Sequence, residues 1–343
     1  MINPKSIPLS KIIDALLDES TPFSPRYLNR LSDLEPADST TLSEIWPKIS
    51  ARRREALLED LEELHLADDL LCFEAVGRIG LKDDLVGVRR RAVSLLQEYE
   101  LVDLLPTFVH MAEHDPDRDV RAAAVAALAP YIYLGEVEDL SPKKLKIVEE
   151  CLFRLASDTE NSLVKRRAIE ALGFSSRPEV VGLIEQAYTS PDVDWLITAL
   201  LAMGRSANSH WKPQVLKMLD HKRPAVRAEA ASAAGELEIK AAVPKLVDLL
   251  EDVDPGVRMA AIWAVSQIGG EGVRAALEKM RAATDDDDEA DQIDDALENL
   301  DFTEEMKDLT LFVIPEDGDE PQEPSENDVD DIKDDLISED DED

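Results

Sequence analysis

A short phrase recurs along this chain: an acidic turn, a valine followed by a basic residue, and an alanine-rich run. It reads EDVDPGVRMAAIWAVSQIGG at 251–270, EHDPDRDVRAAAVAALAP at 113–130 and DHKRPAVRAEAASAAGEL at 220–237. The residue after the valine position falls at Arg89, Arg121, Lys165, Leu196, Arg227, Arg258 and, weakly, Ala290. Successive copies are 31 or 32 residues apart, except for one interval of 44. A fixed period of this length indicates one structural unit built several times.

Each copy has the residue spacing of a helix pair. An alanine stands four residues after the valine position, and a small or apolar residue stands four further on, so both lie on one helix face. A second amphipathic run precedes each copy, such as LVDLLPTFVHMAEHD at 101–115. Aspartate and proline in the phrase suit a turn and a helix start, because the carboxylate accepts backbone N–H groups and proline fits the first helical turn. We therefore expect two helices joined by a tight turn in each copy.

A helix pair of about 31 residues cannot bury its own apolar face, so the copies must stack into a solenoid with a continuous core. The D-x-x-V-R turn, followed by runs such as AIEALGF at 168–174, resembles the HEAT repeat family, in particular its phycobilisome-lyase-like short repeats. The resemblance implies an all-α fold, a right-handed α-α superhelix. It is specific for architecture, because the family includes scaffolds, lyases and a few enzymes.

The chain divides into three predicted parts. Residues 1–66 carry several proline breaks and are expected to form a helical capping region. Residues 67–300 hold about seven helix pairs, with an insertion near 130–142 that accounts for the long interval. Residues 301–343 are too charged and too poor in apolar residues to fold alone, which predicts a disordered acidic tail.

Charge limits the choice of partners. The formal net charge is −38, and residues 285–343 hold 29 acidic and 2 basic residues, a net −27. Such a chain repels nucleic acid instead of gripping its phosphates. The acidic tail has two interpretations: it keeps the protein soluble, or it acts on function by attracting a basic partner or by binding the chain's own groove.

The cysteines and the lengths of the apolar runs indicate the cellular location of the protein. Cys72 and Cys151 stand alone on apolar helix faces, as in a reduced protein, and no apolar run is long enough to span a membrane. The first twenty residues lack the pattern of a signal peptide. We expect a cytoplasmic protein, a monomer, with no membrane partner.

Catalytic signals are weak. His110 and His114 have the helical i, i+4 spacing of a metal pair, but no HExxH motif surrounds them. HEAT-type di-iron hydroxylases carry repeated His-Glu pairs, and this chain has no HE dipeptide. We therefore expect no metal, no cofactor and no catalytic residues.

The candidate binding residues come from aligning the copies. Two and six residues after the valine position, the residue type varies widely, which indicates solvent-facing positions. In HEAT-like solenoids this second helix lines the concave groove. Early copies then contribute a basic patch and later copies an apolar stripe that suits a docked peptide or helix. The candidates are Arg90, Arg91, Arg166, Arg167, Ile197, Leu201, Met259 and Trp263.

The turn arginines have a structural interpretation. The HEAT resemblance implies a ladder in which each arginine pairs with a turn aspartate of an adjacent copy. The expected arginines are Arg121, Arg227 and Arg258, and the expected acids are Asp117 or Asp119, Asp220 and Asp254. The fourth copy has Trp195 and Leu196 in place of valine and arginine, so the ladder should break there.

Two functions remain. The favoured one is a non-catalytic scaffold that binds a protein or peptide segment in its groove, with the acidic tail steering or inhibiting. The alternative, implied by the family resemblance, is a phycobilin lyase-like protein or a lyase chaperone.

Overall fold

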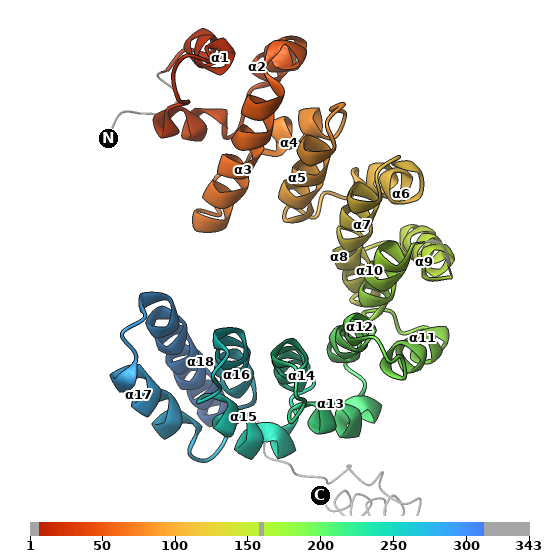
Figure 1. The fold of residues 1–343 in the computed structure, drawn as a ribbon, viewed down its shortest axis with the longest axis vertical. Coiled ribbons are helices and arrows are strands. Elements are labelled where there is room, and N and C mark those ends of the chain that lie inside the picture. The colour runs from red at the N-terminus through yellow and green to blue at the C-terminus, as the bar shows by residue number, and fades with distance from the viewer. Residues whose placement is uncertain (1–6, 158–160, 312–343) are drawn as a thin grey trace, which may run out of the picture.

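The computed structural model describes residues 7–157 and 161–311, and these residues form helices and turns without any strand. The helices form two layers that curve into a C (Figure 1). The inner, concave layer consists of α3 (Ala51–Ala67), α5 (Val86–Gln97), α7 (Arg118–Ala126), α10 (Ser162–Leu172), α12 (Val193–Arg205), α14 (Pro224–Glu236), α16 (Pro255–Ile268) and α18 (Asp287–Leu311). The outer layer consists of α4 (Glu74–Gly80), α6 (Leu105–His114), α9 (Pro142–Ala156), α11 (Glu179–Tyr188), α13 (Lys212–Met218), α15 (Val243–Leu249) and α17 (Val273–Ala283). The predicted all-α solenoid is confirmed.

The recurring phrase forms the turn and the start of each inner helix. In α16 the Asp254 carboxylate accepts the Val257 N–H at 3.2 Å, and Pro255 occupies the first helical position. Asp117 caps α7 in the same way, accepting the Asp119 N–H at 2.8 Å. The cap satisfies backbone donors that have no partner inside the helix, so in these two copies the phrase fixes where the inner helix begins.

Small residues let the inner helices pack closely. The alanine four residues after the valine position is fully buried in every copy from the first to the sixth: Ala92, Ala124, Ala168, Ala199, Ala230 and Ala261. Three glycines 31 residues apart add to this: Gly173, Gly204 and Gly235. A Cβ at Gly173 would lie 2.9 Å from the Ala202 backbone of the next inner helix. Neighbouring inner helices therefore approach backbone to backbone in the middle of the solenoid.

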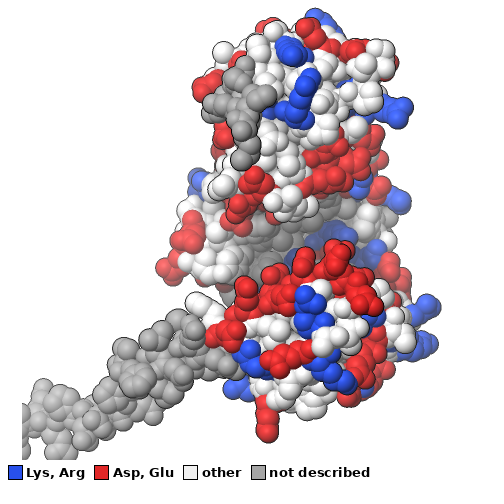
Figure 2. Space-filling model, turned by 90° about the vertical axis from the view of Figure 1, so that its left-hand side faces the viewer, with Lys and Arg blue, Asp and Glu red and all other residues white. Residues whose placement is uncertain are grey.

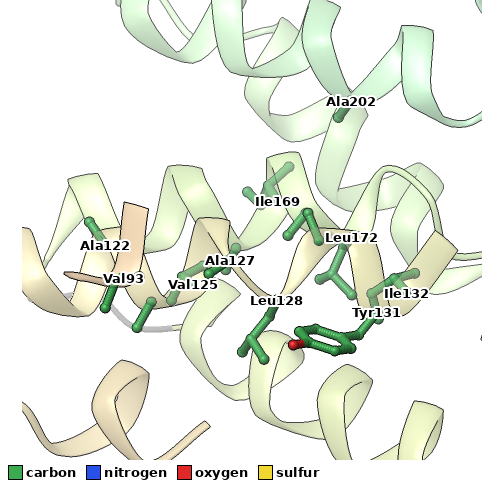
Figure 3. Packing of buried hydrophobic residues seen from close by; sticks show 14 of the residues in the cluster. Val93, Ala122, Val125, Ala127, Leu128, Tyr131, Ile132, Ile169, Leu172 and Ala202 are labelled. Carbon is green, nitrogen blue, oxygen red and sulfur yellow. The ribbon is translucent and has the colours of Figure 1, made fainter. Parts of the chain in front are cut away.

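The insertion that lengthens one interval forms a helix of its own, α8 (Ala129–Glu136). Tyr131 is buried, its hydroxyl donates to the Leu101 carbonyl at 2.8 Å, and burial raises its pKa to about 12. Figure 3 shows Tyr131 and Ile132 beside Leu172 of α10. The insertion therefore extends the core between the second and third copies.

The two ends of the solenoid are covered differently. At the N-terminal end, α1 (Leu9–Leu17) and α2 (Pro36–Ile45) contribute buried Ile12, Leu16 and Leu42. At the C-terminal end, α18 continues through residue 301, where the sequence predicts the start of the tail, and ends at Leu311. The rest of the predicted tail, 312–343, lies outside the described residues.

No helix within the described ranges combines the length and apolar character needed to cross a bilayer.

Candidate functional site

Arginines in the turns connect neighbouring copies. Arg227 binds Asp252 of the next copy with Nε and Nη2, both at 2.8 Å, while its Nη1 donates to the His221 carbonyl of its own turn. This arginine holds the pKa of Asp252 below its ordinary value. Arg258 makes the equivalent contact with Glu289 of α18 at 2.6 Å. Each arginine therefore braces its own turn and joins it to the following one.

The predicted partners in this ladder are wrong for two of the three arginines. Asp220 instead contacts Lys245 at 2.6 Å, and Asp254 caps α16. The acid that pairs belongs to the following copy: Asp252, six residues before Arg258, pairs with Arg227, whereas Glu289 of α18 pairs with Arg258. The carboxylate of Asp254 is engaged by the Val257 N–H of α16, and that of Asp220 by the Lys245 ammonium.

Arg121, the third arginine, donates to the Asp115 carbonyl of its own turn at 2.8 Å. In the fourth copy, where the ladder was expected to break, a different contact joins the copies. The Lys165 ammonium lies 5.8 Å from the centre of the Trp195 ring. A cation–π contact thus occupies the place of the arginine–carboxylate pair there.

The arginines predicted to form a basic patch lie on the inner helices, but most of them pair with acids. Arg91 contacts Glu59 at 2.6 Å and Glu62 at 3.2 Å on α3. Arg166 contacts Asp194 at 2.6 Å, and Arg167 contacts Glu170 at the same distance. Arg90 is exposed. The patch is therefore largely neutralised, because adjacent inner helices supply carboxylates to Arg91 and Arg166, and α10 itself supplies one to Arg167.

The residues of the predicted apolar stripe lie on two inner helices that a third inner helix separates. Ile197 and Leu201 lie on α12, and Met259 and Trp263 lie on α16, with α14 between them. Ile197, Leu201 and Met259 are half-buried, whereas Trp263 remains 36% exposed. Trp263 covers Gly235, where a Cβ would lie 2.6 Å from its ring.

A polar group that the sequence did not single out lies beside this stripe. Glu170 is buried, and its carboxylate accepts from Thr198 at 2.7 Å and from Arg167 at 2.6 Å. Arg205 donates to the Glu170 carbonyl at 2.9 Å and lies 5.0 Å from the centre of the Phe174 ring. Burial lowers the pKa of Arg205. The arginine is thus fixed against α10.

Two carboxylates on α14 complete the group. Burial, and then the charge of Glu170, raise the pKa of Glu229 to about 7, and burial raises the pKa of Glu236. Within the described residues neither carboxylate accepts a hydrogen bond. The sequence contains one signal by which this charged group could have been found: the 31-residue period places Arg205 and Glu236 at equivalent positions of successive copies. Strongly shifted pKa values cluster at functional sites.

We define the central concave face as the groove-facing part of α10, α12, α14 and α16. These helices carry the apolar stripe together with Arg205, Glu229 and Glu236, and Glu236, the last residue of α14, also lines a hollow with Lys212 and Lys240. Figure 2 looks into the opening of the C and shows acidic side chains along the rims of both arms.

The histidine pair of the sequence lies elsewhere, on the outer helix α6. The rings of His110 and His114 stack with centroids 4.8 Å apart, and the His114 Nδ1 lies 3.2 Å from the His110 carbonyl. In the part of the chain that the structure describes, no group of three or more His, Cys, Asp or Glu side chains is arranged to hold a metal ion.

Comparison with known proteins agrees with this architecture. Residues 212–298 match the family model of HEAT repeats, which confirms the predicted repeat type for that segment. No curated protein sequence matches the chain.

Several solved structures are similar in fold. The complex of CpcE and CpcF of phycocyanin lyase from Nostoc is 17% identical with a TM-score of 0.44, over 66% of this chain and 94% of that one. The YibA protein of E. coli is 19% identical with a TM-score of 0.42, over 83% and 99%. Human deoxyhypusine hydroxylase is 19% identical with a TM-score of 0.34, over 76% and 95%.

Proposed function

We propose that this chain is a non-catalytic HEAT-repeat scaffold whose central concave face binds a segment of a partner protein. The observation that supports this most directly is Trp263, a tryptophan 36% exposed on the inner layer of a curved solenoid. Tryptophan is enriched among the residues that dominate binding energy at interfaces, because it offers a large rigid apolar area. Met259, one turn earlier on α16, extends the same surface.

The size of the surface suits a short segment. Adjacent helices pack about 8–10 Å apart, so the step from α12 across α14 to α16 covers about 16–20 Å. An extended chain advances about 3.3 Å per residue, so about five or six residues would cross it. Because the inner helices are already packed against one another, the surface is formed before the partner arrives, which reduces the ordering cost of binding.

The acidic tail has a steering role in this proposal. A self-inhibiting tail would need free arginines in the groove, but Arg91, Arg166 and Arg167 already contact carboxylates. The negative charge of residues 285–343 instead raises the rate at which a basic partner meets the protein. We propose a cytoplasmic monomer that binds protein, with no role for nucleic acid or membrane.

The test places a photo-crosslinking amino acid at position 263 and, as a control, at Gln186 on the outer helix α11. The full-length protein is irradiated in its native cells. A discrete protein adduct at position 263 and none at position 186 supports the proposal. Adducts of the same kind at both positions, or at neither, contradict it.

A further inference from the structure

We infer that the partner segment carries an arginine or lysine next to an apolar side chain, and that Glu229 and Glu236 receive its cation while Trp263 covers the apolar group. This inference rests on the proposed function, and it specifies the chemistry of the partner.

The register of the inner helices shows why Glu229 accepts no hydrogen bond from the described residues. It stands three residues after the valine of its copy. Of the equivalent residues, Arg167 pairs with Glu170 of its own helix, and two others are Arg91 on α5 and Thr198 on α12. Both of these reach back to a carboxylate on the preceding inner helix, Arg91 to Glu62 and Thr198 to Glu170. On α12, the position equivalent to Glu170 is Leu201, which offers no polar group.

The nearby arginine does not compensate for both acids. Arg205 influences Glu229 and Glu236 by its charge, but its guanidinium donates to the Glu170 carbonyl and stacks on Phe174. The Glu170 carboxylate is itself satisfied by Thr198 and Arg167. When ionised, Glu229 and Glu236 carry two negative charges, and Arg205 is the cation whose charge acts on both.

The positive charge of an arginine or lysine from the partner would offset the negative charges of Glu229 and Glu236. An ammonium or guanidinium group donates several hydrogen bonds to carboxylates that accept none from the described residues, and such charge-assisted bonds are among the strongest in proteins. Because Glu229 is partly buried, its attraction for a cation is screened less than that of an exposed acid such as Glu236. The acidic rims of the C and the net charge of −38 favour the approach of a basic segment over an acidic one.

Trp263 places the apolar contact next to this pair. It covers Gly235, the residue that precedes Glu236 in α14. A basic residue and a neighbouring apolar residue of one segment can therefore contact Glu236 and Trp263 together.

The experiment selects peptides from a random 12-residue display library on the full-length protein at physiological salt. Selected peptides are then synthesised and titrated, with the indole N–H signal of Trp263, assigned by comparison with Trp263→Phe, as the reporter. The test variant is Glu229→Gln with Glu236→Gln. The matched control is Glu185→Gln with Glu278→Gln, which removes two acids from the outer helices α11 and α17.

We expect selected peptides that contain arginine or lysine beside an apolar residue, that shift the Trp263 signal, and that bind the test variant at least tenfold more weakly. The control variant should change affinity less than twofold. Neutral peptides that shift Trp263 and bind the test variant equally well would overturn this inference and leave the proposed function intact. Basic peptides that bind without moving the Trp263 signal, or no peptide that moves it, would overturn both.

Discussion

Arg89 of α5 forms a two-pronged ion pair with Asp115 in the turn of the next copy: Nε lies 2.8 Å from Oδ2, and Nη2 lies 2.9 Å from Oδ1. The side chains are only 11% and 6% exposed. The Nη1 of Arg89 also donates to the carbonyls of Asp83 and Asp84 in its own turn. One side chain thus fixes the turn of its own copy and the position of the following copy.

Replacing Asp115 by asparagine should therefore destabilise the solenoid strongly. The change keeps the shape of the side chain but leaves the buried Arg89 charge without its counter-ion, which costs about 3–5 kcal/mol in comparable cases. Urea denaturation measured against the wild-type protein gives the change in the free energy of unfolding. The control is Asp119→Asn, since Asp119 contacts Arg118 with both side chains exposed, and its loss should cost no more than about 1 kcal/mol. Equal effects of the two variants would show that the Arg89 pair contributes little.

The glycines of the inner layer give a second prediction. Gly173→Ala should destabilise the protein by about 1–3 kcal/mol, because the new Cβ would lie 2.9 Å from backbone atoms of Ala202, which cannot move aside alone. Gly182→Ala on the outer helix α11 should stabilise it by about 0.5–1 kcal/mol, since nothing lies within 4 Å and alanine favours the helix. Thermal denaturation of both variants measures the opposite signs. Stabilisation by Gly173→Ala would contradict the close approach of α10 and α12.

The raised pKa of Glu229 predicts how the stability of the folded protein depends on pH. Its pKa is raised in the folded protein to about 7 from 4.5, so the folded state holds the proton more tightly than the unfolded state does. The ionised carboxylate therefore destabilises the fold above pH 7, and this cost disappears as the pH falls from 7 to below 4.5. Glu229→Gln should stabilise the protein at pH 8, by at most about 3 kcal/mol, and have little effect at pH 4.5.

Denaturation of Glu229→Gln and of the exposed control Glu185→Gln at both pH values tests this prediction. The control variant should show the same small change at pH 8 and pH 4.5. A stabilisation of Glu229→Gln that is independent of pH would rule out the raised pKa as its cause.

Removing residues 312–343 tests the steering role of the tail. The deletion takes away 16 acidic residues and one lysine, so association with a basic peptide should slow, and more at 20 mM than at 150 mM salt. Dissociation should be unchanged, because the tail does not contact the bound peptide in this proposal. Stopped-flow mixing measures both rates. Tighter binding after deletion would instead support the self-inhibiting tail.

The recurring phrase determined much of the architecture without any coordinates. A valine, an alanine four residues later and an aspartate or proline before them specify a capped helix with one small apolar face, and that face must be covered by the next copy. The burial of Ala124 and Ala230 and the cap at Asp254 follow from this local pattern. These features were predictable because they depend on residues close together in the sequence.

The contacts between copies were decided only by the tertiary structure. The rotation from one copy to the next selects Asp252 over Asp220 as the partner of Arg227, and it brings Glu59 and Glu62 to Arg91. The described helices bring no hydrogen-bond donor to the Glu229 carboxylate, and burial raises its pKa. The pairing and the pKa of a charged side chain depend on which groups the neighbouring helices bring to it, and the sequence of one helix does not contain that information.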